Sequence, residues 1–436
     1  MDYVAPWWLP GGNVQTIWAA LRARRFVGPP PVFRRERWTT PDSDFVDVDW
    51  LVEIAPTLVA SRTTLPPEAA GLAWGGPALR PLVPAPAYPV CPEPAGGCPP
   101  EGAELRLGRP CASFIAPTLP YPVRPELVEG CLPGGAGLAW DGPALRPPTC
   151  EQPLLVVFHG LEGSSASHYA QAFADVARSR GWAFAVPHFR GCSGELNLAP
   201  RAYHSGDFTE IDWMLRRFAR AHAGPVLAVG ISLGGNALMR WAGELGAPAA
   251  QLVSAVASVC SPLDLTASGW AIGRGFNRQV YTRMFLGTMV PKALQKLEQH
   301  PGLFDREALL AARDLHAFDN VFTGPVHGFK GADDYWQLAS AKPHMRQIAV
   351  PALALNALND PFVPASSLPQ ATDVSRHVTL WQPAYGGHVG FPAAGYPAHV
   401  RAMPEAVATF LAAQLPADAR AGAQAPLGRA RQNGAK

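Results

Sequence analysis

Short runs of apolar residues alternate with amphipathic segments over the second half of the chain. Residues 154–158, 182–186 and 225–229 are apolar throughout, which is typical of parallel strands that are covered on both faces. Residues 167–180 and 208–222 carry their apolar side chains on one stripe, as an amphipathic helix does. Strands that alternate with helices predict an α/β fold with a mostly parallel, doubly wound sheet.

The same pattern continues toward the C-terminus. Residues 252–259, 352–357 and 378–381 are further expected strands, and residues 402–415 are expected to form a closing helix. Residues 264–345 interrupt the alternation with helical, aromatic-rich sequence. An insertion between two parallel strands leaves and re-enters the domain beside the sheet, so we expect a helical cap at its carboxyl edge.

Residues 33–52 predict two more strands, because residues 45–50 alternate with period two after the turn at 41–44. We therefore assign residues 1–53 to an N-terminal segment that supplies the first strands. Residues 153–415 form the core in this interpretation.

Residues 54–152 break the pattern. They hold 21 of the 47 prolines and no lysine, and residues 70–81 return as residues 136–147 with one difference in twelve. Such composition without an apolar face is typical of an irregular, disordered segment. We expect an insert that is tolerated as a surface loop, with a proline-rich arm for a partner as the alternative. Residues 416–436 are expected to be a flexible tail.

Composition excludes several classes of function. A formal net charge of +2 over 436 residues gives no electrostatic reason to expect nucleic acid as a partner. Five of the seven cysteines fall in the insert, and their spacing indicates neither disulfides nor a zinc site. No basic, apolar leader or membrane-length apolar window is evident, so we expect a cytoplasmic protein.

The most informative motif is Gly-Ile-Ser-Leu-Gly at residues 230–234, between an expected strand and an expected helix. This arrangement resembles the nucleophile elbow of the α/β-hydrolases, a turn so tight that its flanking positions are glycines. The serine oxygen stands above the sheet at the positive end of the next helix. The motif predicts Ser232 as a nucleophile.

A serine hydroxyl needs a base to take its proton. In hydrolases with this elbow, the acid and the histidine follow the serine in that order, each after a later strand. Asp360 follows the expected strand 352–357, and His388 follows 378–381. We therefore predict Asp360 as the acid and His388 as the base.

Other acidic side chains are alternatives for the same role. Asp264 follows the preceding expected strand and is the strongest alternative. The weaker candidates, which stand in the wrong part of the order, are Glu162, Asp333 and Asp334.

The loop after strand 154–158 is expected to supply one backbone N–H of an oxyanion hole. That donor is best assigned to Leu161, and the second to Leu233, which follows the nucleophile. His159 is expected to brace this loop, since no second ligand stands at metal spacing. We predict no metal and no organic cofactor.

Longer motifs resemble the YheT-like α/β-hydrolases (α/β-hydrolase family 4). The motifs that carry this resemblance are residues 7–16, 159–169, 189–195, 203–207 and the elbow. The resemblance implies a Ser-Asp-His esterase, with relatives that act on medium-chain acyl esters and phospholipids, and a triad of Ser232, Asp360 and His388. It does not extend over residues 54–152.

Four side chains of these motifs have no evident chemistry, and we expect them to brace the active-site loops: Arg190, Cys192, Tyr203 and His204.

The leading hypothesis is a carboxylic ester hydrolase that acts on short- to medium-chain acyl esters through an acyl-enzyme. An acyltransferase with the same triad and a non-catalytic binding protein on this scaffold are alternatives. A lipase or phospholipase at a membrane surface is another, in which Trp7, Trp8 and Trp18 would sit at the interface. The sequence leaves the oligomeric state open.

Overall fold

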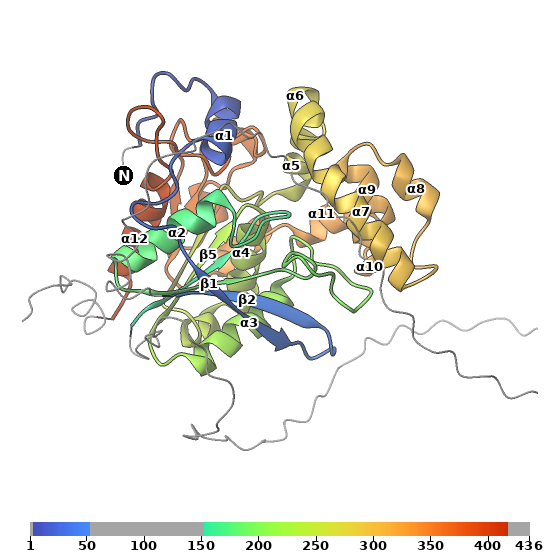
Figure 1. Ribbon diagram of the computed structural model, residues 1–436, viewed down its shortest axis with the longest axis horizontal. Coiled ribbons are helices and arrows are strands. Elements are labelled where there is room, and N and C mark those ends of the chain that lie inside the picture. The colour runs from blue at the N-terminus through green and yellow to red at the C-terminus, as the bar shows by residue number, and fades with distance from the viewer. Residues whose placement is uncertain (1–2, 53–151, 417–436) are drawn as a thin grey trace, which may run out of the picture. The chain divides into compact units, whose positions relative to one another are not determined.

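The computed structural model describes residues 3–52 and 152–416 (Figure 1). The expected insert, except its last residue, and the expected tail from residue 417 onward lie outside the described residues. Within the described part, eight strands form one sheet in the order β1-β2-β4-β3-β5-β6-β7-β8. The strands are β1 (Phe33–Thr39), β2 (Phe45–Leu51), β3 (Leu154–Phe158), β4 (Ala183–Pro187), β5 (Val226–Ile231), β6 (Ala255–Val259), β7 (Ala352–Leu355) and β8 (Val378–Trp381).

The sheet is mostly parallel, as predicted. β1 and β2 form an antiparallel hairpin, and β2 lies antiparallel to β4. The pairings from β4 through β3, β5, β6 and β7 to β8 are all parallel. The carboxyl ends of these six strands therefore meet at one edge, where ligands bind in open α/β sheets.

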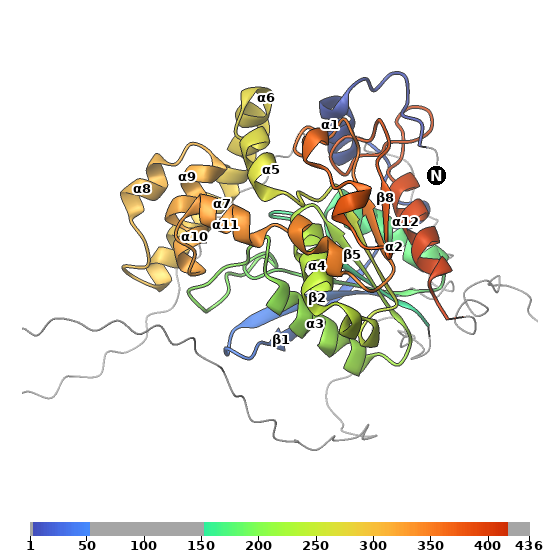
Figure 2. The same cartoon turned by 180° about the vertical axis from the view of Figure 1, so that it is seen from behind.

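Helices cover both faces of the sheet, which explains the continuous apolar runs. Along β3, Leu154 and Val156 pack in one core cluster with α3 (Phe208–Ala221) and α4 (Leu233–Leu245). Leu155 and Val157 pack in the opposite cluster, because successive side chains of a strand point to opposite faces. That second cluster contains residues of α2 (His168–Ser179) and α12 (Ala402–Ala413), which Figures 1 and 2 show on the other side of the sheet.

Several strand boundaries differ from the prediction, by one or two residues in β4 and β5 and by more in β6. Residues 252–254 do not belong to β6, because the 3-10 helix η2 (Ala247–Gln251) precedes them and the N–H groups of Leu252 and Val253 both donate to the carbonyl oxygen of Ala249. β7 ends two residues earlier than expected. The chain then turns toward Asp360.

The predicted helical cap is present between β6 and β7. Figures 1 and 2 show these helices as a group beside the carboxyl edge of the sheet. The elements are α5 (Leu265–Ile272), α6 (Gly275–Asn277), the π-helix η3 (Arg278–Thr282), α7 (Arg283–Gln299), α8 (Arg306–Ala311), α9 (Leu315–Val321), α10 (Thr323–Val326), α11 (Ala332–Ala339) and the 3-10 helix η4 (Lys342–Gln347). Short 3-10 helices η5 (Ala365–Ser367) and η6 (Ala371–Asp373) follow between β7 and β8.

The N-terminal helix α1 (Gly12–Leu21) packs against segments from the other end of the chain. Trp18 donates a hydrogen bond from Nε1 to the carbonyl oxygen of Pro397 at 2.8 Å. Trp8 and Trp18 both contact the ring of Tyr396. Among the helices of residues 3–52 and 152–416, none combines the length and apolar character that a membrane span requires.

Candidate active site

Ser232 lies at the turn between β5 and α4, where the elbow was predicted. Its backbone has φ 51° and ψ −117°, a left-handed conformation that the tight turn imposes. Its N–H donates to the carbonyl oxygen of Val259 at 2.8 Å. A Cβ at Gly230 would lie 2.4 Å from the Cα of Gly235, and one at Gly234 would lie 2.5 Å from a backbone oxygen. The close packing of strand and helix therefore requires both glycines.

The structure brings Ser232, His388 and Asp360 into one hydrogen-bonded series. Nε2 of His388 lies 3.0 Å from Oγ of Ser232. Nδ1 of His388 lies 2.9 Å from Oδ2 and 3.1 Å from Oδ1 of Asp360. Since a carboxylate only accepts, Nδ1 carries a proton in this arrangement and Nε2 is left to accept the serine proton.

The acid is fixed by its own backbone surroundings. Oδ1 of Asp360 accepts hydrogen bonds from the N–H groups of Phe362 at 2.8 Å and Val363 at 3.3 Å. The side chain of Asp360 is fully buried, and that of His388 is 10% exposed. The ring of Phe362 covers the imidazole, with ring centroids 4.1 Å apart. These contacts leave the histidine little freedom to turn away.

The alternative acids are engaged elsewhere. Asp264 caps α5 by accepting from the N–H of Ala267 at 3.0 Å. Asp333 lies 3.2 Å from His316, and Asp334 accepts from the N–H of Lys330. In the part of the chain that the structure describes, none of these carboxylates is hydrogen-bonded to His388.

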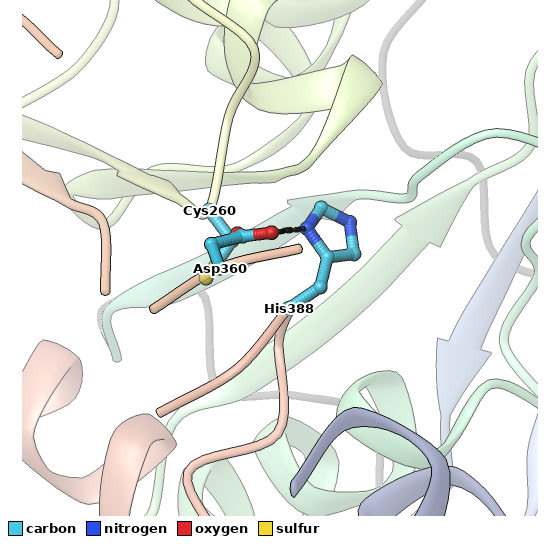
Figure 3. A group of neighbouring side chains, drawn as sticks. All are labelled: Cys260, Asp360 and His388. Atoms are coloured by element: carbon cyan, nitrogen blue, oxygen red, sulfur yellow. Dashed lines mark hydrogen bonds and ion pairs between the residues drawn. The ribbon is translucent and has the colours of Figure 1, made fainter. Parts of the chain in front are cut away.

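A third side chain, Cys260, lies beside the acid and the base (Figure 3). The possible ligand atoms of Cys260, Asp360 and His388 all lie within 4.8 Å of one another. Burial raises the pKa of the Cys260 thiol well above its ordinary value. A cysteine binds a metal ion as the thiolate, which the raised pKa disfavours. The oxygens of Asp360 already accept hydrogen bonds from Nδ1 of His388 and from two backbone N–H groups. The group therefore fits an acid–base pair better than a cation site.

The two residues predicted to supply the oxyanion donors, Leu161 and Leu233, line the same pocket. The neighbouring amides in the first loop are occupied, since the N–H of Gly160 donates to Tyr169 and that of Glu162 donates to Tyr203, each at 3.0 Å. In residues 3–52 and 152–416, the N–H groups of Leu161 and Leu233 have no protein acceptor. Both residues line one pocket with Ser232. Two donors are thus available beside the nucleophile.

His159 holds the start of this loop. Its Nε2 accepts the N–H of Phe189 at 3.0 Å, and its Nδ1 lies 2.8 Å from the carbonyl oxygen of Gly160. Burial lowers the pKa of His159 to about 3. The ring is neutral at physiological pH and connects the ends of β3 and β4.

The loop is also tied to the cap. Glu162, which has φ 57°, forms an ion pair with Lys292 of α7 at 2.8 Å. The hydroxyl of Tyr203 donates to Oε1 of Glu162 at 2.9 Å. The residue next to Leu161 is therefore fixed by both the core and the cap.

The cap encloses a pocket above Ser232. It holds about 1090 Å³ of space, part of which is open to solvent. Its apolar lining comes largely from the cap and includes Leu265, Ile272, Phe285, Met289, Phe318 and Phe322. An apolar chain fits such a wall, and the nucleophile lies at its base.

The remaining motif side chains make structural contacts. Arg190 is bonded to Asp42, Asp44 and Glu210, and so joins the β1–β2 turn to α3. Burial raises the pKa of the Cys192 thiol to about 12, which makes it a poor nucleophile.

Three polar residues around the base were missed in the sequence: Gln15, Thr16 and Asn359. All three accept hydrogen bonds from backbone N–H groups of the loop that carries His388. Gln15 and Thr16 belong to the N-terminal motif at residues 7–16, which was the only signal available for them.

Comparison with known proteins identifies a matching family and several related sequences. The sequence model of the family described as alpha/beta hydrolase fold matches residues 153–394, more than half of the chain. “Putative esterase YheT” of Escherichia coli K12 is 40% identical over 248 residues, which cover 55% of this chain and 71% of that protein. Phospholipase ABHD3 of Mus musculus is 27% identical over 249 residues, covering 55% and 58%.

A monoacylglycerol lipase of Saccharomyces cerevisiae is 27% identical over 248 residues, covering 55% of each chain. The matched region thus spans less than two thirds of the mouse and yeast proteins.

Proposed function

The chain belongs to the α/β-hydrolase fold family and resembles its YheT-like members, and from this premise we propose that it hydrolyses carboxylic esters with Ser232 as the nucleophile. Relatives named esterase, phospholipase and lipase support a carboxylic ester hydrolase. The observation that carries the proposal is the series from Oγ of Ser232 through His388 to Asp360, at 3.0 and 2.9 Å. It is the geometry that general-base activation of a serine needs.

The proposed reaction begins when Oγ of Ser232 attacks the acyl carbonyl carbon. Nε2 of His388 takes the hydroxyl proton, and the carboxylate of Asp360 stabilises the imidazolium. The N–H groups of Leu161 and Leu233 donate to the oxyanion that forms. His388 then passes the proton to the leaving alcohol, and an acyl-enzyme remains.

Water releases the acid in the second half of the reaction. His388 takes a proton from the water, which attacks the acyl carbonyl, and returns the proton to Oγ of Ser232. The substrates that we propose are small esters of short- to medium-chain acids. The apolar wall formed by α5, α7 and α9 supports this class, since burial of an alkyl chain contributes about 0.8 kcal/mol per CH₂.

An acyltransferase would use the same groups with an alcohol in place of water. Incubation with an ester and excess ethanol separates the two, since an acyltransferase yields the ethyl ester and a hydrolase yields the free acid. A cytoplasmic location stays a prediction of the sequence.

A lipase that acts at a membrane surface is the second candidate. The observation that favours it is the exposure of Trp7, 91% exposed, and Tyr396, 78% exposed, beside α1. Trp8 and Trp18 pack against Tyr396 and are less available to lipid. Co-sedimentation with phosphatidylcholine vesicles tests this candidate, and Trp7→Ala should then reduce the bound fraction.

The proposed function is tested by labelling with a fluorophosphonate and by hydrolysis of p-nitrophenyl hexanoate. We expect one labelled peptide that contains Ser232, and loss of hydrolysis in proportion to labelling. A labelled serine at another position would contradict the assignment. An unlabelled, inactive protein would favour a non-catalytic binding protein.

A further inference from the structure

The first turn of α1 lies against the two loops that carry Asp360 and His388. Figures 1 and 2 both show α1 next to the C-terminal loops of the chain. The reaction proposed above uses no residue of α1 or of the motif at 7–16. The contacts of this turn indicate a role in placing the base.

Three consecutive backbone N–H groups of the histidine loop are each bound by a side chain. The N–H of Gly386 donates to Oε1 of Gln15 at 2.9 Å. The N–H of Gly387 donates to Oδ1 of Asn359 at 3.0 Å. The N–H of His388 donates to Oγ1 of Thr16 at 2.8 Å. The loop is also held by the N–H of Phe391, which donates to the carbonyl oxygen of Gly386 at 2.8 Å. Of these bonds, only those from Gln15 and Thr16 come from the N-terminal segment.

The three acceptors are themselves oriented. Gln15 is 1% exposed, and its Nε2 donates to the carbonyl oxygen of Leu9 at 2.9 Å. Asn359 donates from Nδ2 to Oε1 of Gln15 at 3.0 Å. Thr16 donates from Oγ1 to the carbonyl oxygen of Gly12 at 2.7 Å. The acceptor atoms therefore cannot rotate away without breaking a second hydrogen bond.

Backbone packing brings the same segments together. A Cβ at Gly12 would lie 1.8 Å from the carbonyl oxygen of Asn359. A Cβ at Gly387, where φ is 62°, would lie 2.6 Å from the carbonyl oxygen of Gly12. Only glycine, which has no Cβ, allows the backbone segments to lie this close together at these two positions. The helix turn, the acid loop and the histidine loop thus form one close-packed unit.

The helix is also held by contacts outside its first turn. Ala19 and Ala23 pack with Ala172 of α2 and with Val400. Trp18 is hydrogen-bonded to the carbonyl oxygen of Pro397. A helix fixed in this way can serve as a rigid support for the loop.

We propose that Thr16 and Gln15 are positioning residues that hold His388 in line with Ser232, an inference that rests on the proposed function. Loss of the Thr16 hydroxyl leaves the N–H of His388 without its acceptor, and the loop then relaxes toward another partner. A shift of the imidazole lengthens the bond to Ser232 and slows every step in which the proton moves. Substrate binding in the pocket is not affected.

The test uses Thr16→Val, which keeps the shape of the side chain and removes the acceptor. We expect kcat for p-nitrophenyl hexanoate and the rate of fluorophosphonate labelling to fall together by about 10- to 100-fold, with KM nearly unchanged. Thr16→Ser retains an acceptor and should restore most of both rates. A merely structural role would lower the thermal midpoint without this separation of kcat from KM.

The matched control is Trp18→Phe, which removes a different hydrogen bond of the same helix. It should lower the thermal midpoint with little change in kcat. Equal losses of kcat in Trp18→Phe and Thr16→Val would overturn the proposal, as would unchanged rates in Thr16→Val or failure of Thr16→Ser to restore them.

If Thr16→Val yields no folded protein, Asn359→Asp provides the second variant. It keeps the acceptor for Gly387 and loses the donor to Gln15, so a smaller fall in kcat of about 3- to 10-fold is expected. Unchanged kcat in this variant would count against the proposal.

Wild-type protein is labelled in the same series. Absence of labelling at Ser232 in the wild type would overturn the proposed function itself, whereas equal labelling of wild type and Thr16→Val would overturn only the positioning role.

Discussion

Nε2 of His388 lies 3.0 Å from Oγ of Ser232, although the two residues are 156 positions apart in the chain. Ser232 follows β5 and His388 follows β8, so both stand at the carboxyl edge of the parallel sheet. The loops that join them to the sheet set the distance, and the cap closes the space above them. Each part of this arrangement can be tested separately.

Replacement of the nucleophile should remove activity without unfolding the protein. Ser232→Ala is expected to lower kcat by about 10⁴-fold or more, in line with removal of a triad member in other enzymes. Circular dichroism and the thermal midpoint should be unchanged. Ser179→Ala, at the end of α2, is the control and should retain full activity. Ester hydrolysis that persists in Ser232→Ala would exclude this residue as the nucleophile.

The assignment of the acid is tested by comparing two aspartates. Asp360→Asn should lower kcat by orders of magnitude, and His388→Ala should lower it further, because the acid orients and stabilises the histidine. Asp264→Asn should have nearly normal kcat, since Asp264 caps α5 and asparagine caps about as well. The reverse order, with Asp264→Asn inactive and Asp360→Asn active, would show that the acid is misassigned.

The pocket should set the preferred acyl chain. We expect kcat/KM for p-nitrophenyl hexanoate or octanoate to exceed that for the acetate, because the longer chains bury apolar surface against the cap. Met289→Trp fills part of the pocket and should shift the preference toward acetate. Met284→Trp changes an exposed residue of the same helix and should leave the preference as it is. Faster turnover of acetate by the wild type would argue against an acyl pocket.

The cap contains a carboxyl group that should make stability depend on pH. Burial raises the pKa of Asp319 to about 6, although Trp336 donates a hydrogen bond from Nε1 to it at 2.8 Å. The folded state therefore binds this proton more tightly than the unfolded state, in which the pKa of an aspartate is 3.8. The contribution of Asp319 to the free energy of unfolding falls as pH rises from about 4 to about 6 and is constant above.

Asp319→Asn does not titrate and can still accept the hydrogen bond from Trp336. Relative to wild type, its free energy of unfolding should rise by up to about 3 kcal/mol between about pH 4 and about pH 7. Urea unfolding of both proteins at the two pH values measures the difference. A difference that does not change with pH, or that changes with the opposite sign, would disprove the role of this carboxyl.

The expected insert should be dispensable. The eight described strands pair in one continuous order without residues 54–152, and both flanking regions resemble one hydrolase pattern. Deletion of these residues, with Glu53 joined to Pro153 through a few turn residues, should leave esterase activity intact and improve solubility. Limited proteolysis of the full chain should cut this region first. An inactive deletion protein would show that the insert contributes to the fold.

Much of the fold was predictable because its signals are local. β3 and β5 are short apolar runs that each lie buried on both faces, and the glycines around Ser232 mark a turn that only small residues allow. The positions of Asp360 and His388 follow from chain order once the strands are known.

The side chains that hold the catalytic loops in place were not predictable in the same way. Thr16 contacts His388 across 372 positions of sequence, and nothing in its neighbours indicates that contact. The role of Tyr203 as the acceptor for the N–H of Glu162 likewise depends on how two loops meet. Polar side chains that bind loop backbone show no periodicity, so pattern analysis gives no expectation for them.

The contact between α1 and the histidine loop also bears on how the protein is made. Residue 16 is synthesised 372 positions before its partner, which at about 5–20 residues per second is about 20 to 75 seconds earlier. Throughout that interval Gln15 and Thr16 lack the backbone groups that they bind in the folded protein. The nascent chain can form much of the sheet as it emerges, but the base is fixed in place only when the last strand is finished. The order of synthesis thus keeps the proton-transfer machinery incomplete until residue 388 has been added to the chain.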